Sequence, residues 1–244
     1  MRSGNPVLRE KTFEQFAATE SAEVMTVQGT INCSATLIAI LVAASAVTWW
    51  FVSTTPAAAI PLMIGGVVGG LVFALIICFK PHLAPSLASV YAIVEGLVLG
   101  AISCFMNEHF PGIVAQAIGL TLGVFVMMLV IYRTRLIRVT EGFKAGVIAA
   151  TGAICLVYLV SFVLRLFGLS VPFIHDSGWI GIGFSLFVIV IAALNLVLDF
   201  HFIEQGAAFR APKYMQWYAA FGLLVTLVWL YLEILRLLAK LQRR

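Results

Sequence analysis

Long apolar runs separated by short polar stretches dominate the chain. Because a helix that crosses a bilayer needs about 20 mostly apolar residues, each run of this length predicts a membrane-spanning helix. Unbroken runs favour helices over barrel strands, in which apolar and polar residues alternate. The pattern therefore predicts an all-α membrane protein, a bundle of seven transmembrane helices. Their expected bounds are Ile31 to Val52, Ala57 to Phe79, Pro85 to Phe105, Pro111 to Tyr132, Ala145 to Leu166, Gly178 to Phe202 and Met215 to Leu241.

Composition agrees with this pattern. The chain is 62% hydrophobic and 11% charged, whereas a soluble domain is about half apolar and about a quarter charged. With no linker or charge block in view, residues 31–241 are expected to form one membrane domain, followed by a basic tail at 242–244. Residues 1–30 form an N-terminal segment, and its mixed charges from Arg9 to Glu23 are compatible with an amphipathic helix.

Basic residues give the expected orientation. By the positive-inside rule the N-terminus is cytoplasmic, because the loops of the other side offer only Arg165. The C-terminal basic cluster argues the opposite way, since seven spans place it outside, unless the last helix is a partial or re-entrant span. The net charge of +4 reflects topology, and nucleic acid is not an expected partner. The residues at the first, third, fifth and seventh helix starts are Arg2, Arg9, Lys11, Lys80, Arg133, Arg135, Arg138, Lys144, Arg210 and Lys213, and the opposing cluster is Arg236, Lys240, Arg243 and Arg244.

Three carboxylates, Glu95, Asp199 and Glu233, lie inside the predicted spans. An ionised side chain in hydrocarbon is costly, so such residues usually face a protein-lined interior and carry a proton or an ion. At 1.5 Å per residue, Glu95 lies about 15 Å beyond Pro85 and Asp199 about 10 Å before Gly206, at similar depths from one side. If their helices are neighbours, these two carboxylates can share a proton or a cation.

Each carboxylate is also weighed against a purely structural role. Arg236 follows Glu233 by three residues on one helix face, which predicts an internal ion pair. Asp199 can be an interfacial carboxylate paired with His201 or Lys213. Glu95 has no basic neighbour within a turn, so a structural role explains it least well.

Other polar residues near Asp199 supply secondary candidates. Asn195, one turn earlier on the same face, can hydrogen-bond Asp199 or act as a cation ligand. His201 can tune a pH response, whereas Glu204 has the position of a solvated charge at a helix end. The chain has no phosphate loop, His-Glu-x-x-His or Gly-x-Ser-x-Gly motif. We therefore expect no enzyme and no cofactor, only transported calcium or protons.

The sixth and seventh spans carry a family resemblance. The segments from Asn195 to Glu204 and from Trp217 to Leu238 resemble the transmembrane Bax inhibitor motif family, specifically its bacterial branch, as do Ser3 to Leu8 and Glu95 to Ser103. The resemblance implies a seven-helix bundle around a central last helix in a bacterial plasma membrane. For studied relatives it implies a pH-sensitive calcium leak.

In those relatives, a sixth-helix aspartate bonded to a seventh-helix aspartate closes the pore. Asp199 matches the first, and alignment on Leu235 to Leu237 puts Thr226 at the second position. Glu233 lies about two turns from Thr226, too far for a direct replacement. The second helix also lacks the arginine that holds the sixth-helix aspartate in some relatives. Both departures make Glu95 the expected partner of Asp199.

Two classes of function follow. The first is a passive, pH-sensitive leak of a cation, with Asp199 and Glu95 as a protonatable pair and calcium ligands, helped by Asn195, Thr226 and backbone carbonyls. The second is a non-conducting membrane protein that modulates a membrane protease or a stress response through Arg9 to Glu23. A proton-coupled transporter is a third reading, although the chain shows no inverted repeat.

Overall fold

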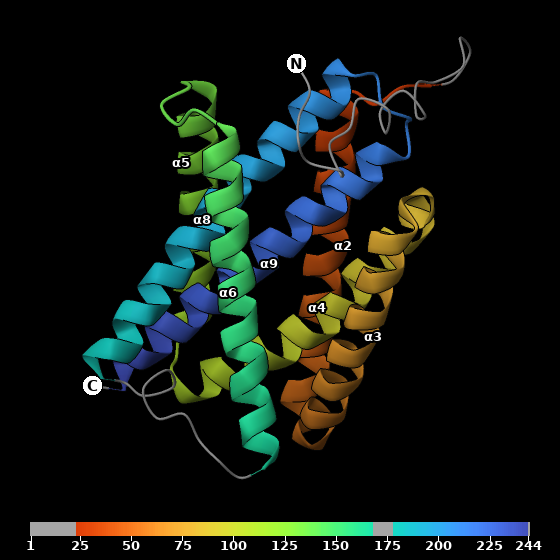
Figure 1. Ribbon diagram of the computed structural model, residues 1–244. Coiled ribbons are helices and arrows are strands. Elements are labelled where there is room, and N and C mark those ends of the chain that lie inside the picture. The colour runs from red at the N-terminus through yellow and green to blue at the C-terminus, as the bar shows by residue number, and fades with distance from the viewer. Residues whose placement is uncertain (1–22, 168–177, 244) are drawn as a thin grey trace. The chain divides into compact units, whose positions relative to one another are not determined.

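The computed structural model describes residues 23–167 and 178–243, and Figure 1 traces its helices in chain order. Seven helices within these residues are long and apolar enough to cross a membrane, which confirms the predicted fold class. The segment up to residue 22, with most of the expected amphipathic helix, lies outside the described residues. The helices are α2 (Val27–Thr54), α3 (Ala59–Phe79), α4 (Ala84–His109), α5 (Ile113–Arg133), α6 (Glu141–Leu166), α8 (Trp179–Ala208) and α9 (Met215–Gln242).

Polar caps and turn residues explain several boundaries. Helix α2 begins at Val27 rather than Ile31, because the Thr26 hydroxyl accepts a hydrogen bond from the Gly29 amide at 3.0 Å. Between α4 and α5, Gly112 has a φ of +84°, which favours glycine, and its amide donates to Asn107 Oδ1 at 3.0 Å. Short 3-10 turns that start with proline, η2 (Pro56–Ala58) and η3 (Pro81–Leu83), precede α3 and α4.

The interior is formed mainly by three helices. In the most apolar 18-residue stretch of each span, the share of buried residues is 56% for α4, 50% for α8 and 56% for α9. In the other spans it is 17–22%. The remaining helices expose large apolar side chains such as Ile64 on α3 and Phe162 on α6. Such apolar surfaces are compatible with contact to lipid tails, which are as apolar as these side chains. With its 28 residues, α9 is long enough for a full span rather than a partial one.

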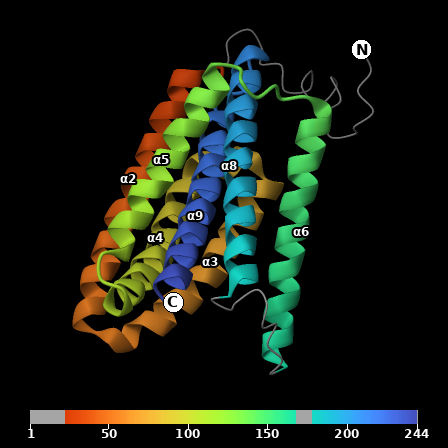
Figure 2. The same cartoon turned by 90° about the vertical axis from the view of Figure 1, so that its left-hand side faces the viewer.

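The chain forms two compact units. One is built from Met1–Cys104 with His201–Leu224, and the other from Phe105–Phe200 with Val225–Arg244. Helices α4, α8 and α9 each contribute residues to both units. In both views α8 and α9 run side by side in opposite directions (Figure 2), as the short connection between them requires. The central position expected of the last helix stays a prediction.

Close helix contacts hold the first unit together. On α4, a Cβ added at Gly96 would lie 2.8 Å from the backbone oxygen of Leu41 on α2. The buried Gly66 and Gly70 of α3 face α4 in the same way, whereas Gly65 has open space around it. Small residues at these positions let the helix backbones approach each other. The glycine pattern therefore contributes to packing, as its spacing predicts.

The residues before α2 are fastened to the turn between α8 and α9. The Met25 amide donates to the Ala211 carbonyl at 2.7 Å, and the Lys213 amide donates to the Glu23 carbonyl at 3.0 Å. The side chains of Glu23 and Lys213 also form an ion pair. Met25 is 1% exposed and packs against Gly206. We call residues 23–25 the strap.

Candidate functional site

Asp199 lies on α8 within the second unit, where α9 supplies its partner. The Thr226 hydroxyl is hydrogen-bonded to the Asp199 carboxylate, and Thr226 is buried. The other carboxylate oxygen, Oδ2, is buried and finds no hydrogen-bond partner among the described residues. Thr226, which stands where the second aspartate is expected, is therefore hydrogen-bonded to one carboxylate oxygen of Asp199. A proton or a cation can bind the other.

Asn195 connects α8 to α6 instead of to Asp199. Its Nδ2 donates to Thr151 Oγ1 at 2.8 Å and to the Ile191 carbonyl at 2.9 Å. No bond between Asn195 and Asp199 occurs in the described part of the chain, so the spacing of one turn was a poor guide to this pair. A role for the Asn195 amide oxygen as a cation ligand stays a prediction.

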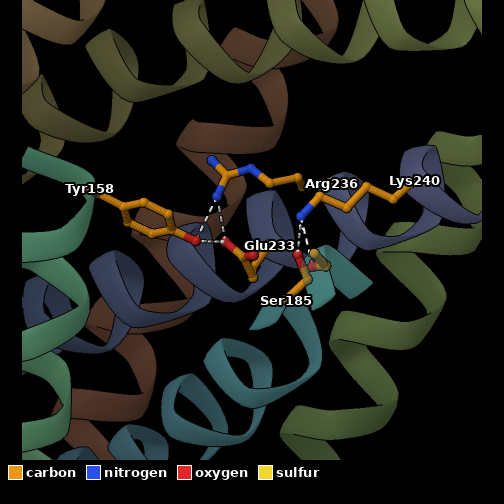
Figure 3. Close-up of polar contacts among 6 residues, drawn as sticks. Tyr158, Ser185, Glu233, Arg236 and Lys240 are labelled. Atoms are coloured by element: carbon orange, nitrogen blue, oxygen red, sulfur yellow. Dashed lines mark hydrogen bonds and ion pairs between the residues drawn. The ribbon is translucent and has the colours of Figure 1, made fainter. Parts of the chain in front are cut away.

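Glu233 is the centre of a polar cluster within the apolar second unit (Figure 3). Its side chain is 1% exposed, and its Oε2 accepts hydrogen bonds from Arg236 Nη1 and from the Tyr158 hydroxyl, both at 2.8 Å. Arg236 Nη1 also donates to the Tyr158 oxygen at 2.7 Å. The ion pair expected from the spacing is thus present. Tyr158, from α6, is a third member that the sequence did not reveal.

Lys240 extends this cluster toward α8. The lysine is 6% exposed, and its Nζ donates to the Gly181 carbonyl at 2.9 Å and to Ser185 Oγ at 3.0 Å. It follows Glu233 by seven residues, so both lie on one face of α9. That spacing was the available signal, but the basic residues around Lys240 made it look like an ordinary helix-end cation.

Glu95 belongs to the first unit, where it is half-buried on α4. Its carboxylate is hydrogen-bonded to the Tyr91 hydroxyl one turn earlier, and the Tyr91 ring meets Phe221 edge to face at 4.9 Å between centroids. A Cβ on Gly70 of α3 would come within 3.0 Å of Glu95 Oε2. Gly70 therefore makes room for this carboxylate. Since Asp199 lies in the other unit, the pairing of Glu95 with Asp199 stays a prediction.

The secondary candidates fall at the end of α8. His201 is half-buried and Glu204 is exposed. The Lys213 ammonium binds the Glu23 carboxylate, and the pairing of Asp199 with His201 or Lys213 stays a prediction. Among the described residues, no group of three or more His, Cys, Asp or Glu side chains is placed to hold a metal ion. A calcium site at Asp199 would therefore have to draw on hydroxyl and carbonyl oxygens.

Seven apolar helices with carboxylates set deep inside them define an integral multi-pass membrane protein. Residues 5–243 match the family described as Bax inhibitor 1 like. The chain therefore belongs to that family, as its resemblance predicted. Neither a curated protein nor a solved structure matches it.

Proposed function

We propose that this protein mediates a passive, pH-sensitive leak of a cation, calcium or protons, through an intramembrane site centred on Asp199. Glu95 is the proposed second protonatable group. The plasma membrane of a bacterium is the proposed location, with the N-terminus in the cytoplasm. The proposal of a calcium or proton leak rests on the following chemistry.

The observation that carries the proposal is the buried Oδ2 of Asp199, which lacks a hydrogen-bond partner among the described residues. An ionised carboxylate is an acceptor only, whereas a protonated one also donates. In an apolar interior an unpaired charge is strongly unfavourable. Oδ2 therefore favours a state in which it binds a proton or a cation, while Thr226 holds the other oxygen.

Competition between protons and metal ions supplies the pH sensitivity. Protonation of Asp199 removes the negative charge that attracts a cation, so calcium binding at this site should strengthen as pH rises. Thr226 can remain hydrogen-bonded in both states because a hydroxyl both donates and accepts. The site can then change its charge without losing its contact between α8 and α9.

The first prediction concerns flux. In liposomes loaded with calcium-sensitive and pH-sensitive dyes, Asp199→Asn should lower the cation leak about tenfold or more, which corresponds to about 1.4 kcal/mol in the barrier. Glu95→Gln should lower it as well. Glu141→Gln is the matched control, because Glu141 is an exposed carboxylate at the start of α6. Unchanged flux in both Asp199→Asn and Glu95→Gln would contradict the proposal.

A second candidate, a non-conducting interaction protein, is favoured by the strap. Its hydrogen bonds to Ala211 and Lys213 fix the point at which residues 1–22 join the membrane helices. Deleting residues 1–22 separates the two candidates: a lost cellular phenotype with intact flux supports interaction, and lost flux supports conduction.

A further inference from the structure

Helix α5 ends in a turn that holds an arginine in an uncommon backbone conformation. Arg135 has a φ of +54°, in the left-handed region that glycine and asparagine favour at the end of a helix. The Arg135 amide donates to the Tyr132 carbonyl at 3.0 Å, and the Leu136 amide donates to the Ile131 carbonyl at 3.2 Å. Because a Cβ makes this conformation unfavourable, helix stability alone would favour glycine here. The arginine therefore points to another role.

Three arginines gather in this turn, and none of them has an acidic partner among the described residues. Arg133, Arg135 and Arg138 are exposed, and residues 133–140 contain neither Asp nor Glu. The ion pairs of the described chain involve other residues. The turn connects two membrane spans, so it lies at the bilayer surface. We call residues 133–138 the arginine turn. The positive-inside rule accounts for its charge, but not for an arginine in the left-handed position.

An exposed apolar side chain lies within the arginine turn. Leu136 is 77% exposed, although an apolar residue just after the left-handed position usually packs back on its own helix. Helix α8 ends in the same motif, with Arg210 at a φ of +51° and the Ala211 amide donating to the Gly206 carbonyl at 3.0 Å. There the residue after the arginine, Ala211, is buried against Met25. Leu136 instead stays exposed.

We propose that the arginine turn binds an anionic phospholipid: Arg133, Arg135 and Arg138 hold its phosphate, and Leu136 enters the boundary of its acyl chains. A guanidinium presents paired N–H donors that match the oxygens of a phosphate. Each cation beside an anionic membrane surface changes the affinity about fivefold. A free phosphate ion offers no apolar partner for Leu136, so a phospholipid is the occupant that suits both features. This site goes beyond the proposed leak and does not depend on it.

The test measures the unfolding temperature of the purified full-length chain in detergent micelles as lipid is added. Phosphatidylglycerol is compared with phosphatidylcholine of the same acyl chains, and inorganic phosphate is titrated separately at constant ionic strength. A ligand that binds only the folded protein raises its stability as the site fills. We expect saturable stabilisation by phosphatidylglycerol. Equal stabilisation by phosphatidylcholine or by inorganic phosphate would overturn the proposal.

Substitutions of Arg135 separate lipid binding from a structural role. Arg135→Gly suits the left-handed backbone, so its unfolding temperature without lipid should be unchanged or slightly raised. Its apparent affinity for phosphatidylglycerol should fall about fivefold. Arg135→Lys keeps the charge but loses the paired donors, so it should bind more weakly than the wild type and more tightly than Arg135→Gly. Lys80→Gln is the matched control, because it removes one exposed charge at the end of α3.

Leu136→Ser tests the apolar part of the site without changing the charge. It should lower the affinity for phosphatidylglycerol about fivefold, as partial burial of a leucine implies. Wild-type affinity in either Arg135→Gly or Leu136→Ser would overturn the proposal, as would a loss in Lys80→Gln as large as that in Arg135→Gly. None of these measurements requires conduction, so the leak can fail while this site stands, and the reverse.

Discussion

Tyr158 shows how one hydroxyl can secure a buried charge. It accepts from Arg236 and donates to Glu233 Oε2, so it gives one oxygen of a buried carboxylate a second donor. A buried ion pair gains little over apolar packing, but loss of one partner is costly because the other charge remains. The cluster therefore acts as a unit that joins α6 to α9.

Replacing Tyr158 by phenylalanine should lower the free energy of unfolding by about 1–3 kcal/mol, because Glu233 loses a donor in a buried setting. Thermal unfolding in detergent measures the change. Tyr218→Phe is the control, since the Tyr218 ring packs on Phe202 and its hydroxyl makes no hydrogen bond in the described part of the chain. Equal effects of the two substitutions would show that the Tyr158 hydroxyl is not important for stability.

Sequence reasoning at this scale succeeded where partners are close in the chain. The spacing of Glu233 and Arg236 predicted their ion pair, because three residues along a helix bring side chains together. Tyr158 lies 75 residues away from Glu233, and only the packing of α6 on α9 brings it near. The hydrogen bond expected from Asn195 to Asp199 is absent from the described residues for a related reason: the Asn195 amide donates to Thr151 of α6, and local spacing contains no information about α6.

Among the helices, the closest approach of α2 and α4 depends on glycine. Gly96 and Gly100 both lie against the backbone of α2, so neither has room for a side chain. In the sequence, the glycines of α3 form a more obvious packing pattern than those of α4. Gly65 of α3 nevertheless faces open space. A row of small residues predicts that a helix has a packing face, but the partner helix decides which members are used.

Gly96→Ala should therefore destabilise the protein by about 1–3 kcal/mol, the usual effect of inserting a methyl group into a filled interface. Gly65→Ala is the paired control on α3, and it should leave the unfolding temperature unchanged or slightly raised. Similar losses for both variants would indicate a general intolerance of alanine in these helices rather than a specific contact between α2 and α4.

For the whole molecule, the helix count could be predicted from the apolar runs, because length and hydropathy determine a span. The bounds shifted by a few residues where polar caps extend a helix, as at Thr26. The division into two units could not be predicted, since it depends on contacts between residues far apart in the chain. The contacts of the C-terminal basic residues bear on the orientation expected from the sequence.

Each of the described basic residues near the end of α9 has a partner within the protein. Arg236 pairs with Glu233 although its side chain is 42% exposed, Lys240 is buried, and the exposed Arg243 lies over the Phe110 ring at 5.9 Å. The positive-inside rule describes loop charges that interact with the surroundings, so these residues carry little topological weight. We expect the C-terminus outside, opposite a cytoplasmic N-terminus.

Reporter fusions placed after Arg244 test this topology. Alkaline phosphatase is active only outside the cytoplasm, so a fusion of it after Arg244 should be active. Green fluorescent protein fused at the same position should be exported and stay dark. The reversed pattern would mean that one of the seven helices does not cross the membrane. Fusions after Arg138, in the connection between α5 and α6, serve as the cytoplasmic control.

The strap has a consequence for the order of biogenesis. It joins residues near the beginning of the chain to the turn before α9, 190 positions later, within a unit that also contains α2 and α3. The two parts are separated by 190 positions in the chain, and such distant pairings form slowly. Helices α2 and α3 therefore lack part of their contacts in the bilayer until residues up to Leu224 have been synthesised. The unit that contains α2 and α3 is therefore closed only after α5, α6 and α8 have been synthesised.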